Sequence, residues 1–255
     1  MENFVDENLS AYENAIHDIR GPMTIIYTYA QLLEVTKRMP PKALGYIEAM
    51  KRNCFKALKI VNDVSDSSKI RDGYLLPNLV NIDIVELVAG VVESTQPFTV
   101  RKNIKLVCES DFETKIMATD RLLIERVLLN LLSNSIKSVE NEGVVRVSLK
   151  GTDDKVEITV EDNGRGIKAD KLKHIFDRYH TSDSVRGRGI GLAIVREILE
   201  VLGASIEALS DEGVGTKMVI NLPVFVMDAE SGASKLTDDF YIDNMVQIEL
   251  SDDFY

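Results

Sequence analysis

Apolar residues in the first 70 positions recur at alternating spacings of three and four, as one face of an α-helix requires. Two such seams are present, and residues 38–41, which include two prolines, separate them. The pattern predicts a helical hairpin over residues 8–71. Because two helices bury little apolar surface, we expect two hairpins to pair as a four-helix bundle in a homodimer. The seams consist of Ile16, Ile19, Met23, Ile26, Ala30 and Leu33, and of Ala43, Ile47, Met50, Cys54, Ala57, Val61 and Val64.

The pattern changes after Asp72 and Gly73 to alternating strands and helices, which indicates a second domain over residues 78–223. Short connections such as residues 151–154 favour antiparallel neighbours, so an α/β sandwich is predicted. The remaining residues, 224–255, form an acidic extension in which alternating Val246, Ile248 and Leu250 predict one strand. The expected strands are 104–108, 144–150, 155–161, 205–210 and 217–222, and the expected helices are 84–98, 120–140 and 190–202.

Composition and charge narrow the classes of function. The chain has 255 residues, 45% hydrophobic and 28% charged, and a net charge of −11 that is concentrated in the extension. Without basic stripes, nucleic acid is not an expected partner. Two separated cysteines predict neither a disulfide nor a zinc site, which suits a reducing cytoplasm. No apolar run reaches the roughly 18 residues that span a bilayer, so we expect a soluble chain without a membrane segment.

Asn130, Asn134 and Lys137 lie at positions i, i+4 and i+7 of a predicted apolar helix and therefore share one face. The amide oxygen of Asn134 is a suitable Mg²⁺ ligand, and Lys137 can offset phosphate charge. An ordinary solvated helix face explains these three residues equally well when they are taken alone.

Asp162, Gly164 and Gly166 follow a predicted strand directly. The glycines let the backbone approach a flat ligand, and Asp162 can accept a hydrogen bond from an exocyclic amine such as that of adenine. A glycine turn after a strand is the commoner explanation of an isolated motif of this kind.

Two further glycine motifs follow. Gly187, Arg188, Gly189, Gly191 and Leu192 open a predicted helix, where free backbone N–H groups can face a phosphate. Residues 180–186 before them are polar, as suits a mobile lid. The last motif, residues 213–216, ends in Thr216 between two predicted strands and by itself indicates only a hairpin.

In this order the four motifs resemble the N, G1, G2 and G3 boxes of the ATP-binding domain of histidine kinases, and Phe176 matches the F box. The resemblance covers residues 78–223 and implies the Bergerat-type fold shared with gyrase, the Hsp90 chaperones and the MutL proteins. It implies ATP and Mg²⁺ as cofactors, Asn134 as the Mg²⁺ ligand, Asn130 and Lys137 as phosphate neighbours, and Asp162 as the residue that reads adenine. Thr216 would support that contact, and Gly164, Gly166, Ile167 and the second glycine motif would complete the site.

The predicted hairpin is expected to carry the phosphate acceptor, because residues 17–22 resemble the H box in which a histidine accepts phosphate. Neutral imidazole is a competent nucleophile near pH 7, and Asp18 can hold the ring of His17 or take its proton. The resemblance implies a cytoplasmic histidine kinase, or the cytoplasmic part of a membrane-anchored one, that passes the phosphoryl group from His17 to a response regulator receiver domain.

Three other functions are weighed against this one. ATPases of the same fold and serine kinases of the anti-sigma type carry an acid one helical turn before the Mg²⁺ asparagine, where this chain has Asn130, whose amide cannot act as a base. A non-catalytic dimeric scaffold would need degenerate boxes, and these are intact. Gly21 stands where the family has a Thr or Asn that helps to dephosphorylate the partner, which predicts weak phosphatase activity. Met218 and Tyr179 replace commoner Phe residues and are tolerable apolar changes.

Overall fold

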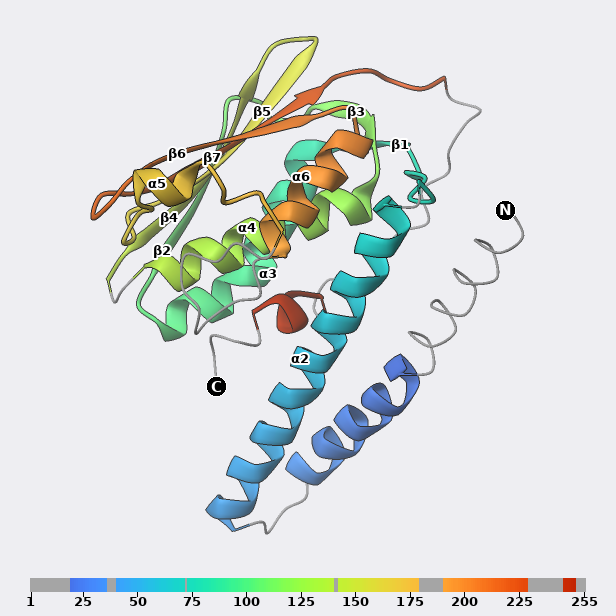
Figure 1. Ribbon diagram of the computed structural model, residues 1–255, viewed down its shortest axis with the longest axis vertical. Helices are drawn as coiled ribbons and strands as arrows, with labels where there is room; N and C mark the ends of the chain where they lie inside the picture. Colours follow the sequence, from blue (N-terminus) through green and yellow to red (C-terminus); the bar gives the residue numbers. More distant parts are fainter. Residues whose placement is uncertain are drawn as a thin grey trace. The chain divides into compact units, whose positions relative to one another are not determined.

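The computed structural model describes residues 19–35, 40–71, 73–139, 142–178, 190–228 and 245–250. The chain divides into two compact units (Figure 1). The first unit comprises Met1–Leu75 and Gln247–Tyr255, and the second comprises Leu76–Val246.

The first unit contains the predicted helical hairpin, formed by a helical segment at 19–34 and the 31-residue helix α2, Pro41–Arg71. Pro41 is tolerated at the first helical position because the N–H that it lacks would have no helical partner there. Tyr27 and Phe55 pack with ring centroids 4.6 Å apart, and Arg20 Nη2 donates to Asn62 Oδ1 at 2.8 Å. Each pair joins one residue of the first helix to one of α2, and together the pairs set the antiparallel register of the hairpin.

The predicted strand at residues 246–250 is wrong, because residues 245–249 are helical. Val246 and Leu250 are four residues apart. This spacing fits the alternation of a strand, but it also places both residues on one face of a helical turn. Ile248 is buried in an apolar cluster of the first unit with Tyr27, Phe55 and others. The cluster consists of Tyr27, Cys54, Phe55, Leu58 and Ile248, with Met23 packed against it.

The second unit is an α/β sandwich, as predicted. A five-stranded sheet has the order β2-β4-β5-β7-β6, in which only β2 and β4 run parallel. Figure 1 shows α3, α4 and α6 together on one face of this sheet. The strands are β2 (Lys105–Ser110), β4 (Val144–Gly151), β5 (Lys155–Asp162), β6 (Ser205–Asp211) and β7 (Gly215–Pro223), and the helices are α3 (Ile84–Arg101), α4 (Arg121–Ser138), α5 (Ala169–Leu172) and α6 (Gly191–Val201).

Two short strands, β1 (Val80–Asp83) and β3 (Ile116–Thr119), pair antiparallel in a separate sheet that the pattern did not predict. The chain beyond β7 continues along them: Ala118 N donates to Phe225 O at 2.7 Å, and Met227 N donates to Asn81 Oδ1 at 2.9 Å. Each strand has only four residues, too few to display a clear alternation.

Side chains at two helix starts and a sheet–helix core stabilise this unit. Asp83 caps α3 by accepting from Val85 N at 3.0 Å, and Asp120 caps α4 by accepting from Leu123 N at 3.1 Å. Alternate residues of the two central strands are buried and form the core with α4. These residues are Val145, Val147 and Leu149 of β4, and Val156, Ile158 and Val160 of β5. Among the described residues, no helix combines the length and apolar character that crossing a membrane requires.

Candidate functional site

Asp162 is the last residue of β5 and is buried, with only 6% of its surface exposed. Ser138 Oγ at the end of α4 donates to Asp162 Oδ1 at 2.7 Å, and Gly164 N donates to the same oxygen at 2.9 Å. Burial raises the pKa of Asp162 above its ordinary value, while hydrogen bonds from Ser138, Gly164, Ser135 and the Thr216 backbone act in the opposite direction. The carboxyl group is therefore fixed in position and desolvated, which suits directional recognition of a hydrogen-bond donor.

The two glycines after Asp162 are required by close backbone packing. A Cβ atom on Gly164 would overlap the side chain and carbonyl of Ser138. Gly166 has φ +65°, and a Cβ there would overlap the carbonyl of Asp211. Arg165 N, between them, donates to Ser138 O at 3.1 Å. The loop is thus held against the end of α4 on one side and β6 on the other.

Thr216 on β7 lies opposite Asp162 on β5 in the register of the sheet. The Thr216 hydroxyl is 3.0 Å from Ser210 Oγ, which accepts from Ile167 N at 2.9 Å. Ser210 therefore connects the strand that carries Thr216 to the loop that carries Ile167. The Thr216 backbone also hydrogen-bonds the Asp162 carboxyl group, and the role of Thr216 in supporting the adenine contact stays a prediction.

Asn130 and Asn134 share one face of α4, and the Asn134 Nδ2 donates to Asn130 Oδ1 at 3.1 Å. Asn130 is buried and Asn134 is exposed. A Cβ on Gly191, at the start of α6, would come within 2.7 Å of Asn130 Nδ2. The glycine thus lets the two motifs approach each other closely.

The other predicted residues lie around this core. Lys137 Nζ donates to Ser133 Oγ at 2.9 Å, and both Phe176 and Leu192 are half-buried. Arg178, two residues after Phe176, makes two 2.8 Å hydrogen bonds to the Glu197 carboxylate, which ties this segment to α6. His17, Asp18, Tyr179, Gly187, Arg188 and Gly189 lie outside the described residues.

Asn134 meets the chemical requirements of a Mg²⁺ ligand. With Nδ2 donating to Asn130, its amide oxygen is the group left to accept or coordinate, and the side chain is exposed. Within the described part of the chain, no group of three or more His, Cys, Asp or Glu residues could hold a metal by itself. Mg²⁺ typically takes one or two protein oxygens together with phosphate oxygens and water, and a single amide oxygen fits this pattern.

Sequence reasoning did not identify Ser138 and Ser210, which organise the contacts of Asp162 and Thr216. For Ser138 a signal was present, because it continues the face of Asn130 and Asn134 at the next i+4 step. Ser210 had no such signal, since it reaches the site only through the pairing of β6 with β7.

Two family models match the chain. Residues 13–73 match the His Kinase A (phospho-acceptor) domain, and residues 119–225 match the histidine kinase-, DNA gyrase B-, and HSP90-like ATPase family. Among curated relatives, the autoinducer 2 sensor kinase/phosphatase LuxQ of Vibrio cholerae is 27% identical over 86% of this chain and 27% of its own length. Sensor protein RprX of Bacteroides fragilis is 29% identical over 84% of this chain and 43% of its own length. The chain thus spans less than half of either relative.

Solved structures have the same fold. Full-length ShkA in complex with AMPPNP aligns with a TM-score of 0.71 and 24% identity over 95% of this chain and 54% of that protein. Histidine kinase ThkA in complex with response regulator protein TrrA aligns with a TM-score of 0.60 and 24% identity over 88% of this chain and 65% of that chain. The catalytic domain of ThkA alone is 26% identical, with a TM-score of 0.53, over 57% of this chain and 95% of that chain.

Proposed function

Residues 13–73 and 119–225 match the two domain families of a two-component histidine kinase catalytic core. On this premise we propose that the chain phosphorylates its own His17 from Mg-ATP and passes the phosphoryl group to an aspartate of a response regulator receiver domain. The observation that carries the proposal is the desolvated Asp162 carboxyl group, held by Ser138 and Gly164 beside the Asn130 and Asn134 face of α4. The Asp162 carboxyl group can recognise the amine of adenine, and Asn134 can bind the Mg²⁺ ion that accompanies the phosphates.

Asp162 supplies nucleotide selectivity in this proposal. Its carboxylate accepts a hydrogen bond from the exocyclic amine of adenine, a donor that guanine does not present at the same position. Gly164 and Gly166 let the loop pack closely against Ser138 and Asp211, and a backbone hydrogen bond from Thr216 limits movement of the Asp162 carboxyl group. The site therefore favours ATP over GTP.

The phosphate end of the site involves Asn134, Lys137 and the glycine motif at residues 187–191. Mg²⁺, when bound at Asn134, would supply positive charge that neutralises the phosphates. Lys137 adds a cation on the same helix, and the start of α6 lies close to Asn130, where its first N–H groups are available to a phosphate. Phosphoryl transfer needs mostly positioning and charge neutralisation, and these groups provide both.

Transfer itself requires the imidazole of His17. An imidazole nitrogen forms a bond to the γ-phosphorus, the bond from that phosphorus to the β,γ-bridging oxygen breaks, and ADP leaves. Asp18 accepts the imidazole proton or holds the ring. In the second reaction a receiver aspartate oxygen attacks the phosphorus and the P–N bond breaks, which restores His17.

Water should compete poorly for the phosphoryl group, because an amide stands at the position of the catalytic base. Asn130 occupies the place of the glutamate in ATPases of this fold, and its amide hydrogen-bonds Asn134. We therefore favour side-chain transfer over ATP hydrolysis and over the non-catalytic scaffold.

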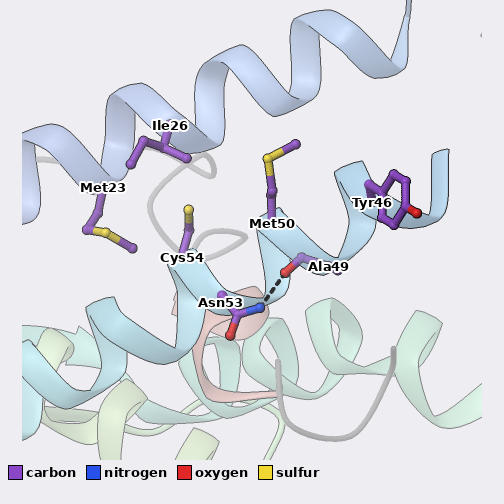
Figure 2. Close-up of a pocket in the computed structure, with 7 residues that line it drawn as sticks. All are labelled: Met23, Ile26, Tyr46, Ala49, Met50, Asn53 and Cys54. Carbon is purple, nitrogen blue, oxygen red and sulfur yellow. Dashed lines mark hydrogen bonds between the residues drawn. The ribbon is translucent and has the colours of Figure 1, made fainter. Parts of the chain in front are cut away.

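A homodimer through the hairpin is also proposed. An apolar groove runs between the helical segment 19–34 and α2, and Figure 2 shows side chains of both helices along it. Several large apolar side chains of the first helix are also exposed, more than one hairpin can bury. A second hairpin would cover them, as the heptad seams predict. The groove is lined by Met23, Ile26, Tyr46, Ala49, Met50, Asn53 and Cys54, and the exposed residues are Ile19, Ile25, Ile26, Tyr29, Leu32 and Leu33.

The nature of the phosphorylated group tests the proposal. After incubation with labelled ATP and Mg²⁺, we expect label on the chain that acid removes and alkali leaves in place, as the P–N bond of phosphohistidine requires. Acid-stable label would indicate serine phosphorylation, and release of free phosphate without protein label would indicate an ATPase. Both results would contradict the assignment. We propose that the chain works in the cytoplasm, by itself or as the cytoplasmic part of a membrane-anchored parent.

A further inference from the structure

Three consecutive residues of the C-terminal segment contact the hairpin, each through a different kind of interaction. Tyr27 Oη donates to Gln247 Oε1 at 2.9 Å. Ile248 is buried in the apolar cluster with Phe55 and Leu58. Lys59 Nζ donates to Glu249 Oε2 at 2.6 Å. An amide, an aliphatic side chain and a carboxylate are thus recognised in sequence order.

The polar contacts belong to a built site and differ from ordinary surface pairs. Glu249 is 3% exposed and Lys59 is 18% exposed, so their ion pair is largely shielded from water. Lys59 Nζ also lies 3.4 Å from the backbone carbonyl of Glu249. Gln31 Nε2 donates to the Tyr27 hydroxyl at 3.0 Å, which directs the hydroxyl hydrogen toward Gln247. The Tyr27 hydroxyl is therefore oriented by a second hairpin residue, and Lys59 contacts two oxygens of Glu249.

The structure describes five helical residues of the segment, 245–249. This stretch amounts to little more than one turn, far below the length at which isolated helices persist in water. Its conformation therefore depends on the contacts with the hairpin. The covalent link through the second unit supplies the high effective concentration that keeps such a small contact formed.

We propose that the hairpin carries a peptide-binding site for a Gln-Ile-Glu segment, and that residues 247–249 of the same chain occupy it as a releasable strap. When it is docked, the second unit is connected to the hairpin unit at both of its ends, through residues 72–79 and through the strap. When it is released, only the first connection remains. This inference goes beyond the proposed kinase activity, and its test requires no catalysis.

Fluorescence anisotropy of a labelled synthetic peptide with the sequence of residues 243–255 tests the site on full-length protein. We expect no binding to the wild-type chain, whose site is occupied, and saturable binding to the Ile248→Ser chain, whose strap has lost its apolar anchor. Adding Lys59→Glu to Ile248→Ser should weaken peptide binding at least about tenfold, because Glu249 of the peptide would then face a like charge. Adding Lys42→Glu instead, the same change at an exposed position of α2, should leave peptide binding by the Ile248→Ser chain unchanged.

A charge-swapped peptide distinguishes specific recognition from damage to the hairpin. A peptide carrying Glu249→Lys should regain affinity for the chain with Ile248→Ser and Lys59→Glu. Equal binding of the original peptide to wild-type and Ile248→Ser chains, no binding to the Ile248→Ser chain, or no rescue by the swapped peptide would each overturn the proposal. Circular dichroism of each chain confirms that its helices are intact.

Zero-length carbodiimide cross-linking identifies the chain that supplies the strap. The reagent joins an ammonium and a carboxylate only when they are already in contact, so Lys59 and Glu249 should form an amide bond. Mass spectrometry is expected to find this bond within single chains on a denaturing gel. A Lys59–Glu249 bond found only in covalent dimers would assign the strap to a second copy and contradict docking within one chain.

Discussion

Two opposing effects act on the pKa of Asp162 in the nucleotide site. Burial favours its protonated form, whereas the Ser138 hydroxyl and the backbone N–H of Gly164 favour the carboxylate that adenine requires. Burial is the larger effect, so the pKa of Asp162 is raised. Nucleotide binding should therefore be sensitive to acid at a higher pH than an ordinary aspartate would produce.

The pH dependence of nucleotide binding follows directly. Affinity for a non-hydrolysable ATP analogue should fall as the pH drops through the raised pKa of Asp162, since the protonated carboxyl group loses acceptor capacity. The stability effect has the opposite sign: between the unfolded and folded pKa values the folded protein holds more protons, so the free energy of unfolding falls as pH rises. Calorimetric titration between pH 4 and pH 8 measures the first effect. Affinity that stays constant across this range would contradict it.

Replacing the carboxylate tests the same contact at constant pH. Asp162→Asn should weaken binding of the ATP analogue roughly tenfold to a hundredfold, the range for a hydrogen bond to a charged group. Asp153→Asn, at an exposed position of the turn between β4 and β5, is the matched control and should bind normally. An Asp162→Asn chain that binds as tightly as the wild type would exclude Asp162 as the residue that reads adenine.

Glycine at position 164 is a steric requirement. In Gly164→Ala the new methyl group would overlap the side chain and carbonyl of Ser138. Thermal unfolding should therefore show that the free energy of unfolding falls by about 1–3 kcal/mol, and nucleotide binding should weaken. Gly90→Ala, in α3, meets open space and should stabilise the same unit by up to about 1 kcal/mol. If the two changes had equal effects, the close approach of the loop to α4 would not be real.

At the scale of elements, the end of α4 organises the site. Asn130 and Asn134 lie along one face of the helix, and Ser138 follows at the next turn, where it reaches the end of β5. The buried apolar residues on the rest of α4 hold this polar face at a fixed distance from the sheet. One helix thus carries both the proposed Mg²⁺ ligand and the support of the adenine contact.

Gly21 in the first helix, on which the prediction of weak phosphatase activity rests, is exposed and has open space around it. Gly21→Thr should raise the rate of phosphate loss from a receiver domain that this kinase has phosphorylated, because a hydroxyl could then help to position water. The measurement follows labelled receiver over time with wild-type and variant chains, and Gly45→Thr, an exposed and open position of α2, is the control. Brisk phosphate loss with the wild-type chain would refute the weak phosphatase activity inferred from Gly21.

Long, strongly periodic elements were predictable from the sequence, and short ones were not. The hairpin and α4 were predictable because their apolar residues keep helical spacing over many turns. The glycine motifs were predictable because of their order along the chain. By contrast, β1 and β3 have four residues each, and their pairing is fixed by contacts distant in sequence. Ile248 lies in a described helical stretch and packs in one cluster with Phe55 and Leu58 of α2, a contact that no local pattern reveals.

The candidate site was predictable to a similar extent. Gly164 and Thr216 both contact Asp162, and Gly191 lies against Asn130, whereas the roles implied for these residues stay predictions. Ser210 escaped prediction because its role depends on which strand lies beside β7. The Arg178–Glu197 pair escaped for the same reason, since it joins two segments whose approach is a tertiary property.

At the scale of the whole molecule, the proposed dimer is the first consequence to test. Ile26 lines the hairpin groove and is 45% exposed in the single chain. Ile26→Glu would bring charge into the proposed four-helix core, so sedimentation should show monomers at concentrations where the wild-type chain is dimeric. Val100→Glu, at a 62% exposed apolar position in the other unit, should leave the dimer intact. A dimeric Ile26→Glu chain would exclude this face as the interface.

The central claim is that a magnesium-nucleotide site built around Asp162 and Asn134 delivers its phosphoryl group to His17. Labelled ATP with Mg²⁺ tests it when the wild-type chain is compared with His17→Gln and with His174→Gln, the same change at an exposed histidine. We predict that His17→Gln still binds nucleotide but takes up no label, while His174→Gln is labelled like the wild type. Labelling of the His17→Gln chain at the wild-type rate would contradict the account.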